Sequence, residues 1–243
     1  MPWKAGWLRY LRMGSAVWAR LWAASSQRMR HRQAALGISD RITEMINLGN
    51  MAWGPILKRE FYERHTVEVA RDLLGKVLVH KRTAGVIVET EAYLGGDDLA
   101  AHSARGITER TRVIFGPAGH AYVYFIYGMY ECLNLVCEPE GKPGCVLIRA
   151  LEPLGEIERM RERRPAARKD KDLASGPGKL TLAMGITRAQ NGVDVTRGAL
   201  VVREPAQKRH VEIAVTPRIG ITKCADLPLR FILRGNRFVS GKR

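Results

Sequence analysis

The segment VIVETEAYLGG, residues 86–96, constrains the fold most, because it has the composition of a buried strand and yet carries two carboxylates. Side chains alternate across a strand, so Glu89, Glu91 and Tyr93 should share one face, opposite Val88 and Thr90. Carboxylates in an apolar setting are costly unless they are paired or used. An edge strand with a solvated face is the alternative, and the apolar run before Glu89 weakens it without excluding it.

The first 50 residues differ from the rest of the chain. They hold eight basic and two acidic residues, and all five tryptophans lie within residues 1–53. Such a stretch is typical of a targeting peptide, of a basic arm that binds nucleic acid, or of a wrongly assigned start. We therefore expect residues 1–50 to be a basic extension, disordered or targeting, and residues 51–243 to form one folded domain. The length suffices for a sizeable core.

The charge balance points to a polyanionic partner. The chain has 40 basic and 24 acidic residues, a net charge of +16, and the part after residue 50 keeps an excess of ten positive charges. Clustered lysine and arginine neutralise phosphates, although a merely basic protein is equally compatible with the charge alone. No stretch approaches eighteen uninterrupted apolar residues, so we expect no transmembrane helix and no membrane partner.

The four cysteines lack a C-x-x-C spacing, and no histidine completes a zinc pattern beside them. We expect buried free thiols in a reducing compartment, with no metal.

The hydrophobic pattern predicts a helix that Thr66 caps and Gly75 ends, and a charged helix over 156–164. A third helix should start within 175–186, where Pro177 stands at the entry. Strands are expected over 76–80, 85–93, 145–151, 200–203, 211–215 and 229–233, and as a pair within 121–137 that turns at residues 127–129. The long loop 95–117 suggests a functional segment.

Four tyrosines occur between Tyr122 and Tyr130. Tyr122 or Tyr130 could simply pack in the core. Tyr127, at the predicted turn, is harder to explain by packing, and in a basic protein an exposed aromatic side chain can enter a base stack.

Several long motifs together resemble one family. The stretches ETEAYLG…AAHS, YVYFIYGMYECLN, CVLIRALEP and SGPGKL occur in this order, and the similarity covers about residues 56–240. They resemble the alkyladenine, or 3-methyladenine, DNA glycosylase family. The resemblance implies an α+β fold, a single compact domain with a mixed, largely antiparallel curved sheet flanked by helices. It also implies a monomer that flips damaged purines out of duplex DNA and hydrolyses the glycosidic bond with water, without cofactor, metal or Schiff-base lysine.

The resemblance assigns the chemistry to three positions. Glu91 corresponds to the general base that orients the attacking water, and Arg149 to the residue that holds this glutamate. The backbone carbonyl near Ile219 would be a third ligand of the water. Strand parity alone nominates Glu89 equally, and only the motif favours Glu91.

The base pocket follows from the same motifs. Tyr93 and His102 resemble one wall and Tyr124 the other, although a lone histidine is more often structural. Asn134 resembles the residue that crowds the 2-amino group of guanine, and Leu147 would shape the pocket.

The DNA-facing surface is assigned in the same way. Tyr127 resembles the wedge that fills the gap left by the flipped nucleotide, and Met129 would shape the surface beside it. Lys179, at the predicted helix start, would contact the DNA backbone, because helix N-termini attract anions; a plain helix start is the alternative.

Two other functions remain as alternatives. A hydrolase of free nucleosides or glycosides could use Glu89 and Glu91 as a carboxylate pair, and a non-catalytic nucleic-acid binder could use Tyr124 and Tyr127 for stacking. The preferred lesion stays open among 3-methyladenine, hypoxanthine and ethenoadenine. We expect a location in the cytoplasm or nucleoid if the source is bacterial, and in the nucleus or an organelle if the extension is a targeting peptide.

Overall fold

The computed structural model describes residues 53–207 and 210–241. The expected basic extension, residues 1–50, therefore lies outside the described residues. The part described is built on a nine-stranded sheet with the order β1-β7-β2-β3-β6-β5-β4, to which β9 adds along β3 and β8 along β9. Every pairing between these strands is antiparallel. The expected α+β class is therefore confirmed. The expected sheet was mixed, but the described sheet contains no parallel pair of strands.

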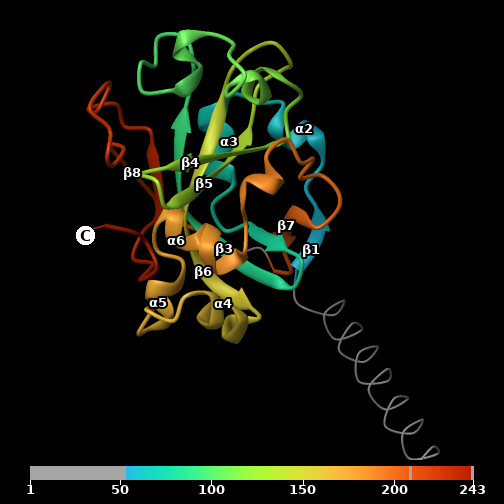
Figure 1. Cartoon of the computed structure of the whole chain (residues 1–243), viewed down its shortest axis with the longest axis vertical. Helices are drawn as coiled ribbons and strands as arrows, with labels where there is room; N and C mark the ends of the chain where they lie inside the picture. Colours follow the sequence, from blue (N-terminus) through green and yellow to red (C-terminus); the bar gives the residue numbers. More distant parts are fainter. Residues whose placement is uncertain (1–52, 208–209, 242–243) are drawn as a thin grey trace, which may run out of the picture. The chain divides into compact units, whose positions relative to one another are not determined.

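Two eleven-residue strands form the centre of the sheet, β3 (Thr83–Tyr93) and β6 (Cys145–Gly155) (Figure 1). The other strands are shorter: β1 (Trp53–Ile56), β2 (Val77–His80), β4 (Ala121–Ile126), β5 (Tyr130–Val136), β7 (Leu200–Pro205), β8 (Ile213–Thr216) and β9 (Arg230–Leu233). Near the glutamates, β3 pairs with β6 on one side and with β9 on the other. The alternative of an edge strand with a solvated face is therefore wrong.

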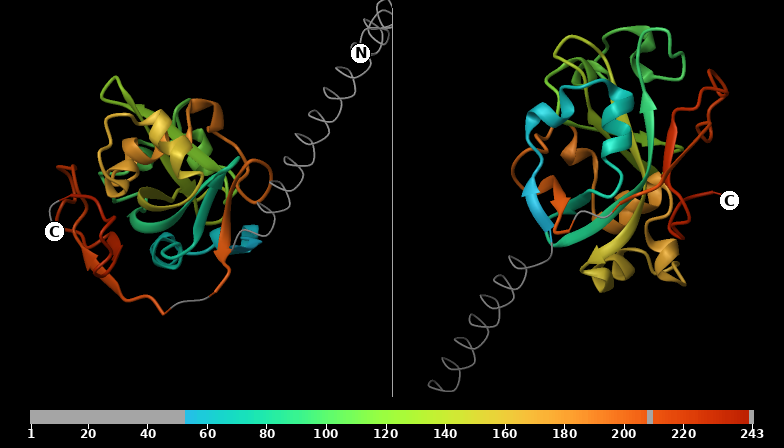
Figure 2. Two further views of the ribbon diagram at one scale, coloured as in Figure 1. Left: turned by 90° about the horizontal axis from the view of Figure 1, so that it is seen from below. Right: turned by 180° about the vertical axis from the view of Figure 1, so that it is seen from behind.

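Five short helices accompany the sheet: α2 (Arg59–Tyr62), α3 (Thr66–Asp72), α4 (Ile157–Arg163), α5 (Asp170–Leu173) and α6 (Pro177–Met184). Three 3-10 helices complete the described elements: η2 (His102–Arg105), η3 (Arg112–Phe115) and η4 (Arg188–Gln190). Helices α4, α5 and α6 lie together, as the two further views show (Figure 2). Apolar residues of α3 and α6 belong to one core cluster with β3, β5 and β6, so these helices leave the glutamate-bearing face of β3 to other segments.

Strand β3 separates its two faces as the alternation predicted. The hydroxyl of Thr90 donates to the carbonyl of Ala70 in α3 over 2.8 Å, so Thr90 faces the helical core. Glu89, Glu91 and Tyr93 make their contacts on the opposite face. The register shifts on either side of Glu89, and such irregularities often lie next to active sites, where they redirect a side chain.

One predicted helix cap was wrong, and one strand was not predicted. His65 caps α3 instead of Thr66, since its ring accepts the backbone N–H of Val67, while Thr66 is buried and bonds to Glu138. Trp53–Ile56 pairs with β7, although no strand was predicted there. The proline of this segment is compatible with an edge strand, and such a short strand leaves little alternation to detect.

The cysteines are all free, and Cys132, Cys137 and Cys145 are buried as expected, whereas Cys224 is half-buried. None of the helices within the described residues is long and apolar enough to cross a membrane.

Candidate active site

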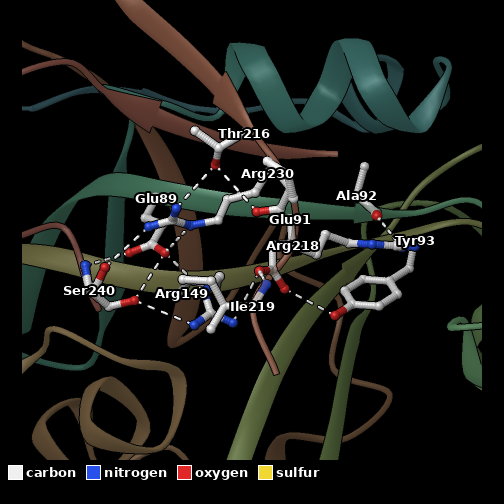
Figure 3. A network of polar contacts seen from close by, with 11 residues as sticks. Glu89, Glu91, Ala92, Tyr93, Arg149, Thr216, Arg218, Ile219, Arg230 and Ser240 are labelled. Carbon is white, nitrogen blue, oxygen red and sulfur yellow. Dashed lines mark hydrogen bonds and ion pairs between the residues drawn. The ribbon is translucent and has the colours of Figure 1, made fainter. Parts of the chain in front are cut away.

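The two glutamates of β3 lie at the base of the candidate site, and both are fully buried, with 0% exposure. Figure 3 shows them on either side of Arg149, which β6 contributes. Arg149 donates from Nε to Glu89 over 2.9 Å and reaches Glu91 from Nη1 at 3.2 Å. One guanidinium therefore contacts two carboxylates that are both fully buried.

Four hydrogen bonds hold Glu89 in place. Its Oε1 accepts from Arg149, from Arg230 of β9 over 2.7 Å and from the hydroxyl of Ser240 over 3.0 Å. Its Oε2 accepts the backbone N–H of Ser240 over 2.6 Å. Glu89 thus fastens the C-terminal segment to the centre of the sheet.

Glu91 has a different set of partners. Its Oε1 accepts the backbone N–H of Ile219 over 2.8 Å, and its Oε2 accepts the hydroxyl of Tyr93 over 3.0 Å. Tyr93, Arg149 and Ile219 all line one cavity, whereas Arg230 and Ser240 do not. Glu91 therefore lies directly behind the cavity wall. Glu89 is instead held mainly by Arg230 and Ser240, which do not line the cavity.

The charge state of Arg149 follows from its neighbours. Burial lowers the pKa of Arg149, but Glu91 and Glu89 outweigh it, so the net pKa is raised. The guanidinium therefore stays charged and forms ion pairs with both glutamates.

The cavity has a volume of about 510 Å³, within the range of small-ligand sites. Its walls are mainly aromatic and apolar, with a few polar groups. They are formed by Tyr93, Ala100, His102, Tyr122, Tyr124, Ile126, Tyr127, Tyr130, Cys132, Asn134, Cys145, Leu147, Arg149, residues 176–179 and residues 219–221. Of the predicted site residues, only Glu91 and Met129 are not in this lining.

The aromatic wall is a connected cluster. The rings of His102 and Tyr124 meet edge to face with centroids 4.6 Å apart, and His102 Nδ1 lies 3.0 Å from the hydroxyl of Tyr122. The structure thus places His102 in contact with Tyr124, which was assigned to the opposite wall. Burial lowers the pKa of His102 to about 4, with a further contribution from Arg110, so the imidazole is neutral at pH 7. Burial also raises the pKa of Tyr124 and keeps its hydroxyl protonated.

Asn134 is held in one orientation. This buried residue lies in β5 opposite Leu147 of β6. Its Nδ2 donates to the carbonyl of Tyr122 over 3.2 Å, and its Oδ1 accepts from the thiol of Cys145 over 3.9 Å. The amide is a fixed polar group in the cavity floor.

The β4–β5 turn projects two side chains from the fold. Tyr127 is 77% exposed and Met129 is 62% exposed. Tyr127 has φ of 53° and Gly128 has φ of 67°, both in the left-handed region, which a tyrosine rarely adopts. The tip of the turn therefore presents an aromatic side chain without burying it.

The start of α6 borders the same cavity. Pro177 occupies the first turn, no side chain caps the helix, and Gly178 lies so close to the ring of Tyr130 that a Cβ would be 2.7 Å from it. Lys179 follows in the cavity wall. Helix N-termini with free N–H groups favour anions.

Sequence reasoning missed two further ion pairs. Arg230 joins Glu89 from β9, and Arg218 binds Asp98 through two hydrogen bonds of 2.6 and 2.7 Å. Arg218 also lies over the ring of Tyr93, 4.6 Å from its centroid (Figure 3). These partners lie more than 100 residues apart in the chain, and no local pattern indicates such contacts.

Within residues 53–207 and 210–241, no group of histidine, cysteine and acidic side chains could hold a metal ion.

Comparisons with known proteins agree with this geometry. The family model described as "Methylpurine-DNA glycosylase (MPG)" matches residues 60–237. A protein of Methanoculleus marisnigri is 56% identical over 190 residues, which cover 76% of this chain and 98% of that protein. A protein of Koribacter versatilis is 52% identical over 194 residues, 77% of this chain and 94% of that protein. A protein of Burkholderia lata is 49% identical over 191 residues, 77% of this chain and 92% of that protein. All three bear the name "Putative 3-methyladenine DNA glycosylase".

We predict that Glu89→Gln destabilises the protein by about 3–5 kcal/mol, because it leaves Arg149 and Arg230 buried without their shared carboxylate. Urea unfolding measures the change. The matched control is Glu212→Gln, which removes the exposed partner of Arg234 and should cost about 0.5 kcal/mol or less. Equal, small losses in both variants would contradict a structural role for Glu89.

Proposed function

We propose, from the premise that this chain belongs to the methylpurine-DNA glycosylase family, that it excises flipped-out damaged purines from duplex DNA with a water activated by Glu91. As a member of the family, it is a DNA glycosylase, a hydrolase of N-glycosyl bonds. Flipping, the activated water, the residue roles and the kinds of damaged purine are the proposal. We further propose that residues 51–243 form the glycosylase domain and act as a monomer.

One observation carries the assignment of Glu91. Its carboxylate is fixed by Arg149, by the N–H of Ile219 and by the hydroxyl of Tyr93, and all three of these residues line the aromatic cavity. Each carboxylate oxygen has two lone-pair directions. A water that enters beside Tyr93 would find an acceptor on Oε2, which has one hydrogen-bond donor among the described residues.

The reaction then proceeds by displacement at the sugar. The N-glycosidic bond breaks as positive charge develops on the sugar ring, and the base leaves with the bonding electrons. The water oxygen bonds to the anomeric carbon, and its proton passes to Glu91. The negative charge of Glu91 stabilises the developing cation before that transfer. Arg149 fixes the position of the carboxylate, and the backbone carbonyl near Ile219 would accept a second hydrogen bond from the water.

The cavity suits a flipped purine. Tyr93, His102 and Tyr124 offer aromatic surfaces on which an extruded base can stack. Stacking also attracts cationic alkylated bases, by roughly 0.5–2 kcal/mol per favourable contact. Asn134, held by the carbonyl of Tyr122, is proposed to crowd the 2-amino group of guanine, and Leu147 opposite it shapes the floor.

The DNA-facing elements border the same cavity. Tyr127 would fill the gap left by the flipped nucleotide, with Met129 beside it at the exposed turn. Lys179, at the start of α6, would meet a backbone phosphate. The net charge of +16 favours a polyanionic partner in general.

The two alternative functions are less well supported. A carboxylate-pair hydrolase would need Glu89 as a second reactive group, and Glu89 already accepts four hydrogen bonds, three of them from residues that do not line the cavity. A non-catalytic nucleic-acid binder would not need a fully buried carboxylate behind its pocket, which costs free energy to maintain.

We predict that Glu91→Gln reduces single-turnover base excision by at least about a hundredfold while binding of lesion-containing duplex survives, because the amide keeps the size but cannot accept a proton. Excision is measured on duplexes that carry hypoxanthine or an alkylated purine. The matched control is Glu138→Gln, which changes a buried glutamate outside the cavity. Excision by Glu91→Gln within a fewfold of wild type would remove Glu91 from the mechanism.

Asn134→Ser should relax discrimination against normal guanine, because a smaller side chain opens space for the 2-amino group. The measurement is the ratio of excision rates for hypoxanthine and guanine opposite the same base. We expect this ratio to fall about tenfold or more, the scale on which a tightly fitted polar group discriminates. An unchanged ratio in a folded variant would refute the role.

Tyr127→Ser should lower the fraction of extruded lesion and weaken binding to damaged duplex, because the hole in the base stack stays unfilled. The glycosidic step itself should change less, since Tyr127 is not among the described contacts of Glu91. A fluorescent lesion that brightens when it unstacks reports the extruded fraction. Equal brightening with wild type and variant would leave Met129→Ser as the next substitution to test.

A further inference from the structure

Arg110 places a guanidinium on one aromatic wall of the cavity. Its Cζ lies 5.2 Å from the centroid of the Tyr124 ring. Burial raises the pKa of the neighbouring Tyr122, and the charge of Arg110 opposes that rise. Both tyrosines line the cavity, whereas Arg110 itself does not. The guanidinium therefore covers the Tyr124 ring from outside the space that a base would occupy.

This positive charge has no carboxylate partner within the described part of the chain, where no ion pair includes Arg110. The other aromatic wall offers a direct contrast. Arg218 lies over the ring of Tyr93 at 4.6 Å, but Asp98 neutralises it through two short hydrogen bonds (Figure 3). Two arginines thus cover two aromatic walls, and only the charge at Tyr124 is uncompensated by a described carboxylate.

The neighbouring histidine adds no second charge at neutral pH. Burial, and then Arg110 itself, lower the pKa of His102 to about 4. Two other cations line the cavity: Arg149, which pairs with Glu89 and Glu91, and Lys179, at the start of α6. Of the two cations that lie over the aromatic walls, Arg110 is therefore the one without a described carboxylate partner.

A cation on one face of an aromatic ring reduces what the other face can offer to a second cation. It already uses the negative electrostatic potential of the ring, and its own charge repels a positively charged ligand. A neutral base loses nothing by this arrangement, because its stacking depends on dispersion and apolar burial. The guanidinium of Arg110 consequently disfavours binding of a cationic base at Tyr124 relative to a neutral base of similar size.

We propose that Arg110 is a specificity-determining residue, which biases excision towards uncharged damaged purines, such as deaminated or etheno-bridged bases, and against cationic N-alkylated purines. This inference rests on the proposed function, since it names the substrate class favoured by the same cavity. Arg110 acts through Tyr124 and does not touch the reacting atoms.

The test compares two lesions in the same duplex, hypoxanthine as the neutral base and 7-methylguanine as the cationic one. Single-turnover rates are measured with saturating enzyme, and each is divided by the rate of spontaneous base loss. Arg110→Gln should raise the ratio of cationic to neutral excision about threefold to tenfold, the scale of one cation–π contact.

Two control variants separate charge at the ring from charge in general. Arg112→Gln removes the same charge two residues away, where the side chain is 65% exposed and pairs with Glu109, and it should leave the ratio unchanged. Arg110→Lys keeps the charge and should keep the wild-type ratio. Thermal unfolding checks that each variant is folded.

The possible outcomes are distinct. An equal fall of both rates with Arg110→Gln would make Arg110 a DNA-backbone contact and would overturn the inference, as would an unchanged ratio. If Arg110→Lys raised the ratio of cationic to neutral excision as much as Arg110→Gln does, the shape of the arginine side chain and not its charge would be responsible. That result would also overturn the inference. Failure of the wild-type protein to release either base would instead contradict the proposed function.

Discussion

The site depends on one buried arginine between two buried carboxylates. Arg149 contacts Glu89 and Glu91, and none of the three side chains is more than slightly exposed. Desolvation of such charges costs several kcal/mol for each ion unless geometry and hydrogen bonds compensate. Arg230 and Ser240 supply the compensation on the side of Glu89, which leaves the contacts of Glu91 to be made by residues of the cavity. The two glutamates thereby become chemically different although they occupy equivalent strand positions.

The contacts around Glu91 also tie separate segments together. Ile219 donates its N–H to Glu91, and its neighbour Arg218 binds Asp98 and covers Tyr93. Asp98 in turn accepts the N–H groups of Leu94 and Ala100, in the loop that leads to η2 and His102. The loop after β3 and the loop before β9 are therefore fixed against each other, and the walls of the cavity are fixed relative to the carboxylate.

The sequence predicted much of this arrangement because several signals were local. Strand parity placed Glu89, Glu91 and Tyr93 on one face, and the glycine beside Tyr127 marked the turn that exposes it. Parity could not distinguish the two glutamates, since the partners that do so, Arg230 and Ser240, come from the end of the chain.

Other features depended on tertiary contacts that no periodicity encodes. The cap of α3 shifted to His65 because Glu138, far along the chain, bonds to Thr66. The strand Trp53–Ile56 exists through its pairing with β7. The guanidiniums over the two tyrosines likewise come from loops whose paths are set by the packed fold.

The central claim is that the charge of Glu91 faces the position where the sugar becomes cationic. The most direct measurement compares binding of two duplexes, one with a cationic pyrrolidine abasic analogue and one with its neutral tetrahydrofuran counterpart. The wild-type protein should bind the cationic duplex more tightly, by about tenfold or more, because an enzyme binds its transition state better than its ground state. Glu91→Gln should abolish that preference. An equal preference in both proteins would contradict the account.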